Sequence, residues 1–141
     1  IDAFYKKKKI NIFNKGKMFR DFTFVDDIAE GVLKILSKKP KIDKKFNHYK
    51  PIPSRSSAPF NIFNIGNGKK VHLMKFINIL EKKLGSKIKK NFLPMQMGDV
   101  RQTLSDISKL NKVTGYDSKT DVDEGVSKFV DWYNEYFKKK N

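Results

Sequence analysis

Cysteine is absent from this sequence of 141 residues, and tryptophan occurs only once. The lack of cysteine excludes disulfides and thiolate metal sites, and it fits a cytoplasmic protein. There is no run of about 18 consecutive apolar residues, so the sequence predicts no membrane-spanning helix. Hydrophobic residues still make up 38% of the chain and include 12 phenylalanines, which is enough for the core of one domain of this length.

Acidic residues are few beside basic ones, with 15 Asp and Glu against 31 Lys and Arg and a formal net charge of +16. A charge of this size attracts polyanions, so a basic nucleic-acid-binding module is one interpretation. However, proteins that read bases and phosphates rely on the bidentate fork of arginine. Only three of the basic residues here are arginines, and the lysines are spread over all the predicted helices and both chain ends. We therefore favour a lysine-rich composition without a nucleic-acid function.

The spacing of apolar residues predicts short strands alternating with helices, an α/β arrangement within a single region covering residues 1–141. The expected strands cover residues 9–13, 22–25, 60–65 and 88–93. The expected helices cover residues 2–8, 26–36, 73–84, about 105–113 and about 121–137. Gly85 is the expected left-handed stop of the third helix.

Several features between these elements carry further expectations. Asp26 or Asp27 is the expected N-cap of the second helix, and Ser105 or Asp106 that of the fourth. Residues 37–59 are polar and hold four prolines, which predicts a long surface loop. The first five residues, IDAFY, resemble a helix already under way and lack an initiator Met. We therefore expect the chain to be a fragment of a longer protein.

Patterns for catalysis or metal binding are scarce. The sequence contains no Gly-x-Gly-x-x-Gly and no Walker lysine loop. His48 and His72 stand alone without metal-ligand spacing, so each is expected to be structural or incidental. Tyr5 and Lys9 match a Tyr-x-x-x-Lys pair by letter only, inside a run of lysines. The sequence therefore predicts no catalytic residue and no metal site.

Two places could hold an anionic or hydroxyl-bearing small molecule. Arg20 lies between a glycine turn and a predicted strand, with Phe19 and Phe22 beside it. Its alternative interpretation is a local ion pair with the adjacent Asp21. Asp99 lies in a Met-Gly-Asp turn and could accept hydrogen bonds from two hydroxyls, although an ordinary Asx-turn is the alternative.

Four segments together resemble a known family. Residues 16–28 (GKMFRDFTFVDDI) closely resemble the Gly-x-x-x-Arg-Asp-Phe-x-(Tyr/Phe)-(Val/Ile)-Asp-Asp segment of extended short-chain dehydrogenases/reductases that act on nucleotide sugars. Residues 56–67 (SSAPFNIFNIGN) and 93–100 (LPMQMGDV) look like the corresponding stretches of UDP-glucuronate 4-epimerases, and residues 125–133 (GVSKFVDWY) fit that family's final helix. Order and spacing agree over the whole chain, so the sequence resembles the C-terminal part of such an epimerase.

The resemblance implies a binding site for a UDP-sugar. Arg20 matches the family arginine that contacts the diphosphate, a role suited to a guanidinium that offers two parallel N–H groups. Asp99 matches the acidic residue near the ribose hydroxyls. Asn11, Ile12 and Phe13 match the strand beside the uracil, where backbone groups and a flat side chain read the base.

The second diphosphate contact departs from the pattern of related galactose epimerases. In those enzymes an arginine stands near the position of Gln96, and a tyrosine near that of Thr103. Arg101 is a candidate substitute for the missing arginine.

The resemblance also implies what this chain lacks. Family members bind NAD in an N-terminal Rossmann half, which also carries the catalytic Tyr-x-x-x-Lys pair. We therefore expect a C-terminal substrate-binding region that binds UDP-glucuronate or UDP-galacturonate, holds no NAD by itself and is inactive alone. A fragment of a UDP-xylose synthase or of a dTDP-glucose dehydratase is the alternative within the superfamily. Apolar surface that would lean on the Rossmann half predicts self-association into a homo-oligomer.

Overall fold

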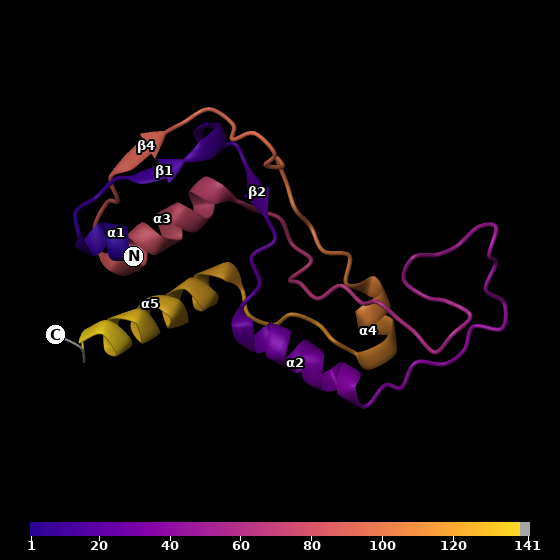
Figure 1. Ribbon diagram of the computed structural model, residues 1–141. Coiled ribbons are helices and arrows are strands. Elements are labelled where there is room, and N and C mark those ends of the chain that lie inside the picture. Colours follow the sequence, from indigo (N-terminus) through magenta and orange to yellow (C-terminus); the bar gives the residue numbers. More distant parts are fainter. Residues whose placement is uncertain (139–141) are drawn as a thin grey trace.

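The computed structural model describes residues 1–138 and has a mixed α/β composition, as the sequence predicts (Figure 1). The elements follow one another as α1 (Asp2–Tyr5), β1 (Ile10–Ile12), the 3-10 helix η1 (Phe13–Gly16), β2 (Phe19–Arg20), α2 (Val25–Leu36), β3 (Val71–His72), α3 (Leu73–Leu84), β4 (Lys90–Phe92), α4 (Ser108–Thr114) and α5 (Val122–Lys138). No helix in this range is long and apolar enough to cross a membrane.

The described strands form two separate two-stranded sheets. β1 and β4 are parallel, with Ile10 opposite Lys90 and Ile12 opposite Phe92. β2 and β3 are antiparallel, with Arg20 opposite Val71. The first pair lies over α3, and α5 lies on the other side of that helix (Figure 1). This arrangement places β2 between the α3 layer and the part of the molecule that contains α2 and α4.

The core is made by the apolar faces of these helices. Ile77 of α3 and Val126 and Val130 of α5 are buried, and the spacing of four residues keeps the two valines on one side of α5. An ion pair between Lys83 Nζ and Asp131 Oδ2, 3.0 Å apart, also joins α3 to α5. A second buried group, Leu110 and Tyr116, lies around α4.

The ends of α3 follow from local chemistry. Gly85 adopts a φ of +73° and ends the helix, which confirms the expected glycine stop. At the other end, Nδ1 of His72 accepts a hydrogen bond from the backbone N–H of Met74 at 3.2 Å. His72 therefore caps a helix and has a structural role.

The expected N-cap of α2 is wrong. The helix begins at Val25 after the extended residue Phe24, and no side chain caps it. Asp26 and Asp27 both lie in its first turn, and the carboxylate of Asp27 is buried. Asp27 binds distant groups at residues 118–120 instead, because burial favours partners that the tertiary fold supplies.

Two expected strands are also wrong. Residues 22–24 are irregular, and the strand β2 ends at Arg20, two residues before the expected start. Within residues 60–65 only Asn61 forms a bridge, an isolated one with Arg55. Phe60 and Ile62 are 43% and 49% exposed. An alternating pattern marks a segment that could pair, but a strand forms only where another strand is available alongside it.

Residues 37–59 contain no helix and extend away from the remainder of the molecule (Figure 1). The base of this loop is held by Lys109 of α4, whose Nζ donates to the carbonyls of Ser54 at 2.6 Å and Ile62 at 3.0 Å. Burial, and secondarily the charge of Arg55, lower the pKa of Lys109. The ammonium group of Lys109 therefore fixes the loop to the fold by donating hydrogen bonds to two carbonyls.

Glu81 of α3 is a buried carboxylate that fixes the chain before β4. It accepts hydrogen bonds from the backbone N–H of Ile88 at 2.8 Å and from Lys87 Nζ at 3.0 Å, and it also pairs with Lys90 Nζ. Removing the charge of Glu81 would leave the buried N–H of Ile88 and the largely buried ammonium of Lys90 poorly matched.

Acid is expected to weaken the fold through Glu81. Burial alone would raise its pKa, but the hydrogen bonds from Lys90, Ile88 and Lys87 outweigh burial and lower the pKa from 4.5 to about 2. Because the folded pKa lies below the unfolded one, the stabilisation is complete at neutral pH and is lost as the pH falls from about 5 to about 2. The shift corresponds to about 3 kcal/mol in the free energy of unfolding.

Urea unfolding followed by circular dichroism at stepped pH measures this loss. The Glu81→Gln variant should be less stable at neutral pH and should lose less stability over the same acid range. Equal losses in the two proteins would contradict the assignment to Glu81.

Candidate functional site

The two segments that carry the predicted binding residues lie side by side. The backbone N–H of Leu93 donates to the carbonyl of Ile12 at 2.9 Å, and that of Lys15 donates to the carbonyl of Leu93 at 3.0 Å. Further along, Phe19 N–H donates to the carbonyl of Arg101 at 3.0 Å. The chain after β4 therefore follows the path of β1, η1 and β2.

Arg20 and Asp99, far apart in sequence, meet where these segments run together. Nη2 of Arg20 lies 2.7 Å from Oδ1 of Asp99, and Nη1 donates to the carbonyl of Phe19 at 2.8 Å. Their side chains are 23% and 31% exposed, so solvent and ligands reach both. A partly exposed ion pair of this kind contributes only about 1 kcal/mol, so an anionic ligand can rearrange it at little cost.

The structure corrects the alternative interpretations of Arg20 and of Asp99. Arg20 pairs with Asp99, not with the adjacent Asp21, because neighbouring side chains in an extended segment point to opposite sides. The Asx-turn at Asp99 is not formed, because its Oδ1 accepts the N–H of the next residue, Val100, at 2.7 Å and not that of Arg101. The contacts with Val100 and Arg20 share the same carboxylate oxygen.

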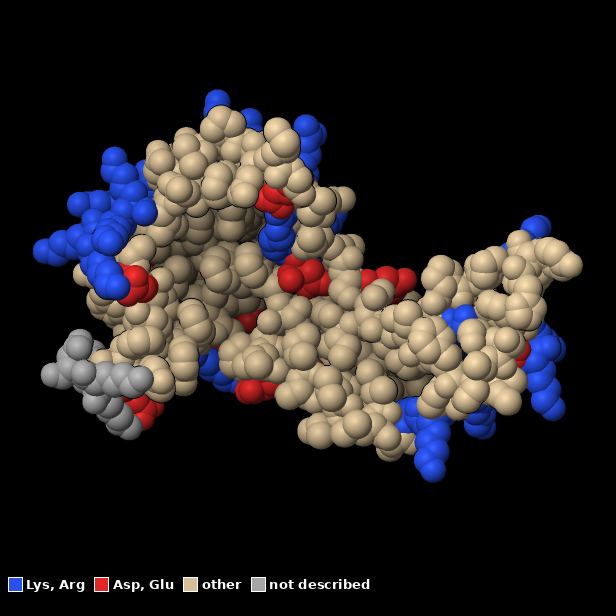
Figure 2. Space-filling view, viewed as in Figure 1, with Lys and Arg blue, Asp and Glu red and all other residues tan. Residues whose placement is uncertain are grey.

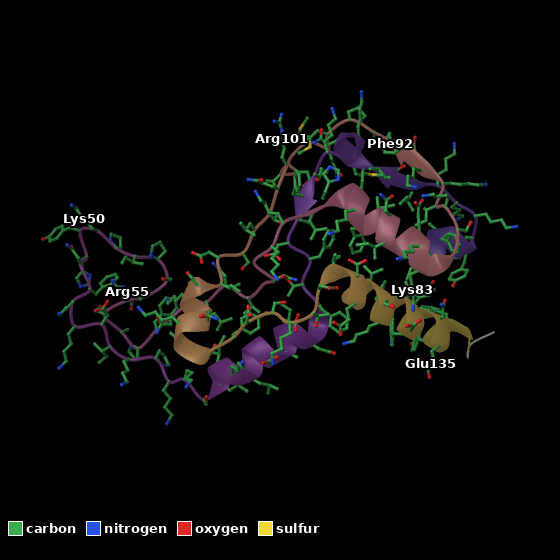
Figure 3. The ribbon with its side chains drawn as sticks, turned by 180° about the vertical axis from the view of Figure 1, so that it is seen from behind. Lys50, Arg55, Lys83, Phe92, Arg101 and Glu135 are labelled. Atoms are coloured by element: carbon green, nitrogen blue, oxygen red, sulfur yellow. The ribbon has the colours of Figure 1, made fainter. Side chains whose placement is uncertain are left out.

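The uracil-side residues lie on β1 and its continuation. Asn11 is exposed, and its Oδ1 accepts a hydrogen bond from Asn91 Nδ2 at 3.0 Å. Ile12 is buried in the core, so only its backbone faces the neighbouring segment. Phe13 is partly exposed at the start of η1, and the exposed Phe92 stands opposite Ile12 on β4 (Figure 3).

Gln96 and Arg101 belong to the irregular segment after β4. Both side chains are exposed. Among the described residues, neither of these two side chains forms a hydrogen bond with Arg20 or Asp99. The carbonyl of Gln96 accepts the N–H of Asp99 at 3.2 Å, and that of Arg101 accepts the N–H of Phe19. In this structure the two residues shape the segment through their backbones.

Asp21 is a residue whose importance the sequence did not reveal. Its Oδ1 accepts the backbone N–H of Asn67 at 3.0 Å, and its Oδ2 accepts those of Gly68 at 3.0 Å and Ser105 at 2.9 Å. A Gly-Asn-Gly turn presents several backbone N–H groups together, and such groups favour an anionic acceptor. The Gly-Asn-Gly turn at residues 66–68 was the feature of the sequence that could have indicated a role for a nearby carboxylate.

Asp27 plays a comparable part at the start of α2. It accepts hydrogen bonds from the Ser118 hydroxyl at 2.7 Å and from the N–H and hydroxyl of Thr120 at 3.1 and 3.2 Å. Burial raises the pKa of this carboxyl, but the hydrogen bonds outweigh burial and leave the pKa below its ordinary value. Asp27 therefore stays charged and ties α2 to the chain before α5.

Charge is unevenly placed around the molecule. Figure 2 shows Lys and Arg gathered mainly at the two ends of this face, with further basic side chains along its upper edge and acidic side chains between and among them. A nucleic-acid-binding surface usually presents one continuous basic stripe. In the described part of the chain, no group of three or more His, Asp or Glu residues could hold a metal ion.

The comparisons with known proteins agree with the sequence motifs. The family described as GDP-mannose 4,6 dehydratase matches residues 3–129. The chain belongs to the nucleotide-sugar epimerase and dehydratase family. The protein CapI of Staphylococcus aureus is 39% identical over 97% of this chain, and a probable UDP-glucuronate 4-epimerase of Rhizobium meliloti is 35% identical over 99% of it. The chain spans 41% of the length of each of these relatives.

A solved structure agrees at the level of the fold. The UDP-glucuronic acid 4-epimerase of Bacillus cereus, in complex with UDP-glucuronic acid and NAD, matches with a TM-score of 0.74 and 26% identity. The match covers 95% of this chain and 38% of that protein. The arrangement of helices and strands is thus that of part of a larger nucleotide-sugar enzyme.

The contact of Gly66 with Ser105 predicts a steric requirement beside Asp21. A Cβ atom on Gly66 would lie 2.4 Å from the Cβ of Ser105. Gly66→Ala is therefore expected to lower the free energy of unfolding by about 1–3 kcal/mol, the usual cost of overpacking. Urea unfolding measures the change.

Gly125→Ala is the matched control for this variant. Its Cβ would lie 3.3 Å from a ring atom of Phe24, a side chain that can shift, and alanine favours the helix by up to about 1 kcal/mol. The control should stay within about 1 kcal/mol of the unmodified protein. Equal destabilisation of both variants would contradict the requirement at Gly66.

Proposed function

We propose that this chain is the UDP-sugar-binding, C-terminal portion of an NAD-dependent nucleotide-sugar 4-epimerase. The observation that carries the proposal is the Arg20–Asp99 pair, at 2.7 Å, in two motifs that occur in the same order in the family. The pair offers both kinds of group that a nucleotide handle needs, a guanidinium for phosphate and a carboxylate for hydroxyls. In the proposed complex the diphosphate takes the place of Asp99 on part of the guanidinium, and Asp99 turns toward the ribose.

The remaining contacts are assigned by position along the same two segments. Asn11, Ile12 and Phe13 lie beside the uracil, with the backbone of β1 and the ring of Phe13 as contacts. Gln96 and Arg101 are exposed on the chain that bears Asp99, so their side chains are free to approach the second phosphate.

UDP-glucuronate or UDP-galacturonate is the proposed substrate. Curated relatives at 35–38% identity carry the name UDP-glucuronate 4-epimerase. The alternative is a portion of a UDP-xylose synthase or a dTDP-glucose dehydratase, because the contacts named here hold the nucleotide and leave the sugar chemistry open.

NAD and the catalytic pair are proposed to belong to the part of the relatives that this chain does not span. The one Gly-x-Gly turn, residues 66–68, does not fit a dinucleotide phosphate because Asp21 already accepts the N–H groups of Asn67 and Gly68. We therefore expect the chain alone to bind no NAD and to catalyse no epimerisation.

Arg20→Ala is expected to remove the thermal stabilisation that UDP gives to this chain. Losing a charge-assisted hydrogen bond to phosphate costs roughly 1.5–3 kcal/mol, which weakens UDP binding by about tenfold or more. The melting temperature with and without UDP measures the effect within each variant, so any change in basal stability cancels.

Arg55→Ala is the matched control, because it removes the same charge from the protruding loop. Arg55 pairs with Asp43 at 3.3 Å and lies far from Arg101 (Figure 3). This variant should keep the UDP effect. Equal loss of the UDP-induced thermal shift in the two variants would assign the shift to the general basicity of the chain. Binding of the chain to random duplex DNA with a steep salt dependence would point to the same explanation.

Self-association is a further expectation, because large apolar side chains are exposed along α2. Val25, Leu33 and Leu36 are 68%, 67% and 74% exposed. An apolar concavity of about 240 Å³ beside Val25 has no part in the Arg20–Asp99 site; it is lined mainly by Phe22, Phe24, Phe76, Val122, Val126 and Phe129. Patches of this kind usually find a partner. Light scattering should detect oligomers, and a monodisperse monomer with a cooperative melt would contradict this expectation.

A further inference from the structure

We infer that Asp21 is the positioning residue for the nucleotide site: it holds the segment that bears Asp99 against the strand that bears Arg20. The inference rests on the proposed UDP-sugar function. Asp21 itself contacts no ligand in this scheme, and it acts through backbone groups.

The segment that bears Asp99 has little else to hold it. Residues 96–104 are all exposed and contain neither a helix nor a strand, apart from one bridge at Gln102. Val100 and Leu104 are both exposed, so no apolar anchor fixes the segment. Its position must therefore come from hydrogen bonds to the neighbouring strand.

Those hydrogen bonds converge on residues 19–21. Thr103 N–H donates to the carbonyl of Phe19 at 3.2 Å, and the N–H of Asp21 donates to the Thr103 hydroxyl at 3.2 Å. The Asp21 carboxylate then binds Ser105 N–H at 2.9 Å and, on the other side, the turn at residues 67–68. One side chain thus joins three separate parts of the chain.

We call the contacts of Asp21 with Ser105 and with the turn at residues 67–68 the clamp. The alternation of side chains at Arg20 and Asp21 connects the clamp to the Arg20–Asp99 site. Arg20, the last residue of β2, points to Asp99, while the next residue, Asp21, points to Ser105, so adjacent residues fix the two ends of the segment 99–105. Releasing the Ser105 end would leave the segment held only by the backbone of Phe19 and Asp21, through Arg101 and Thr103, and this looser segment would let Asp99 shift away from Arg20. A nucleotide would then have to order the segment as it binds, and affinity would fall.

Electrostatics alone predicts that loss of the Asp21 charge strengthens UDP binding, whereas the positioning role predicts weaker binding. Asp21→Asn removes a negative charge next to a site for an anion, which by itself would strengthen UDP binding. The positioning role predicts weaker binding, because one amide cannot replace the two carboxylate oxygens that accept three N–H groups. The direction of the change therefore separates the two effects.

The experiment compares Asp21→Asn with Asp27→Asn by calorimetric titration with UDP. Asp27 is the matched control, since its carboxylate also accepts three hydrogen bonds but ties α2 to residues 118–120. Asp21→Asn should raise the Kd for UDP at least tenfold. Asp27→Asn should lower the melting temperature and leave the Kd within about threefold of the unmodified protein. Unchanged or tighter binding by Asp21→Asn would overturn the inference.

Amide hydrogen exchange gives a second readout that needs no ligand. In Asp21→Asn the amides of Gly68, Thr103 and Ser105 should exchange at least tenfold faster, while those of α3 stay unchanged. Unchanged exchange at these amides overturns the inference whether or not UDP binds. Faster exchange together with no UDP binding by the unmodified protein would support the clamp and overturn the proposed function.

Thr103→Val serves if Asp21→Asn does not fold. It removes only the hydroxyl that accepts the Asp21 N–H, so a smaller change in the same direction is expected in both measurements. An unchanged Kd and unchanged exchange would count against the clamp.

Discussion

Carboxylates that accept backbone N–H groups hold this small fold together. Asp21 joins the turn at residues 67–68 to the chain at Ser105, and Asp27 joins α2 to residues 118–120. Each contact links stretches of chain more than 40 residues apart in sequence. The strands are only two or three residues long, so the sheets order little of the chain. The carboxylates of Asp21 and Asp27 therefore supply part of the long-range order.

The helices supply the remaining order. α3 packs on α5 through their apolar faces, and the buried Glu81 fixes the approach to β4 through ion pairs with the exposed Lys87 and the largely buried Lys90. Glu81 takes two of its partners from the 31 basic residues of the chain, whereas the buried Asp27 binds hydroxyl and backbone N–H groups. The high net charge is thus partly a structural resource, and it need not indicate a nucleic-acid partner.

The candidate site is built on the same principle of distant segments brought together. Arg20 and Asp99 are separated by 78 intervening residues, yet the chain after β4 retraces the path of β1 and β2 and brings them to 2.7 Å. The chain belongs to the nucleotide-sugar epimerase and dehydratase family, and its relatives include a protein named probable UDP-glucuronate 4-epimerase. This membership is the reason for proposing that the Arg20–Asp99 contact marks a nucleotide site. The short span of the chain, about two fifths of those relatives, confines the proposal to holding the nucleotide.

The amino-acid sequence by itself determined the amphipathic helices α3 and α5, the glycine stop at Gly85 and the family motifs around Arg20 and Asp99. These depend on residues within a few positions of one another, where periodicity and turn chemistry act. Only the tertiary structure decided that residues 60–65 form no strand, that Asp27 binds residues 118–120 instead of capping α2, and that Arg20 pairs with Asp99 instead of Asp21. Each of those outcomes depends on a partner far away in sequence, because a strand needs a neighbour and a buried carboxylate takes whichever donors the fold brings to it.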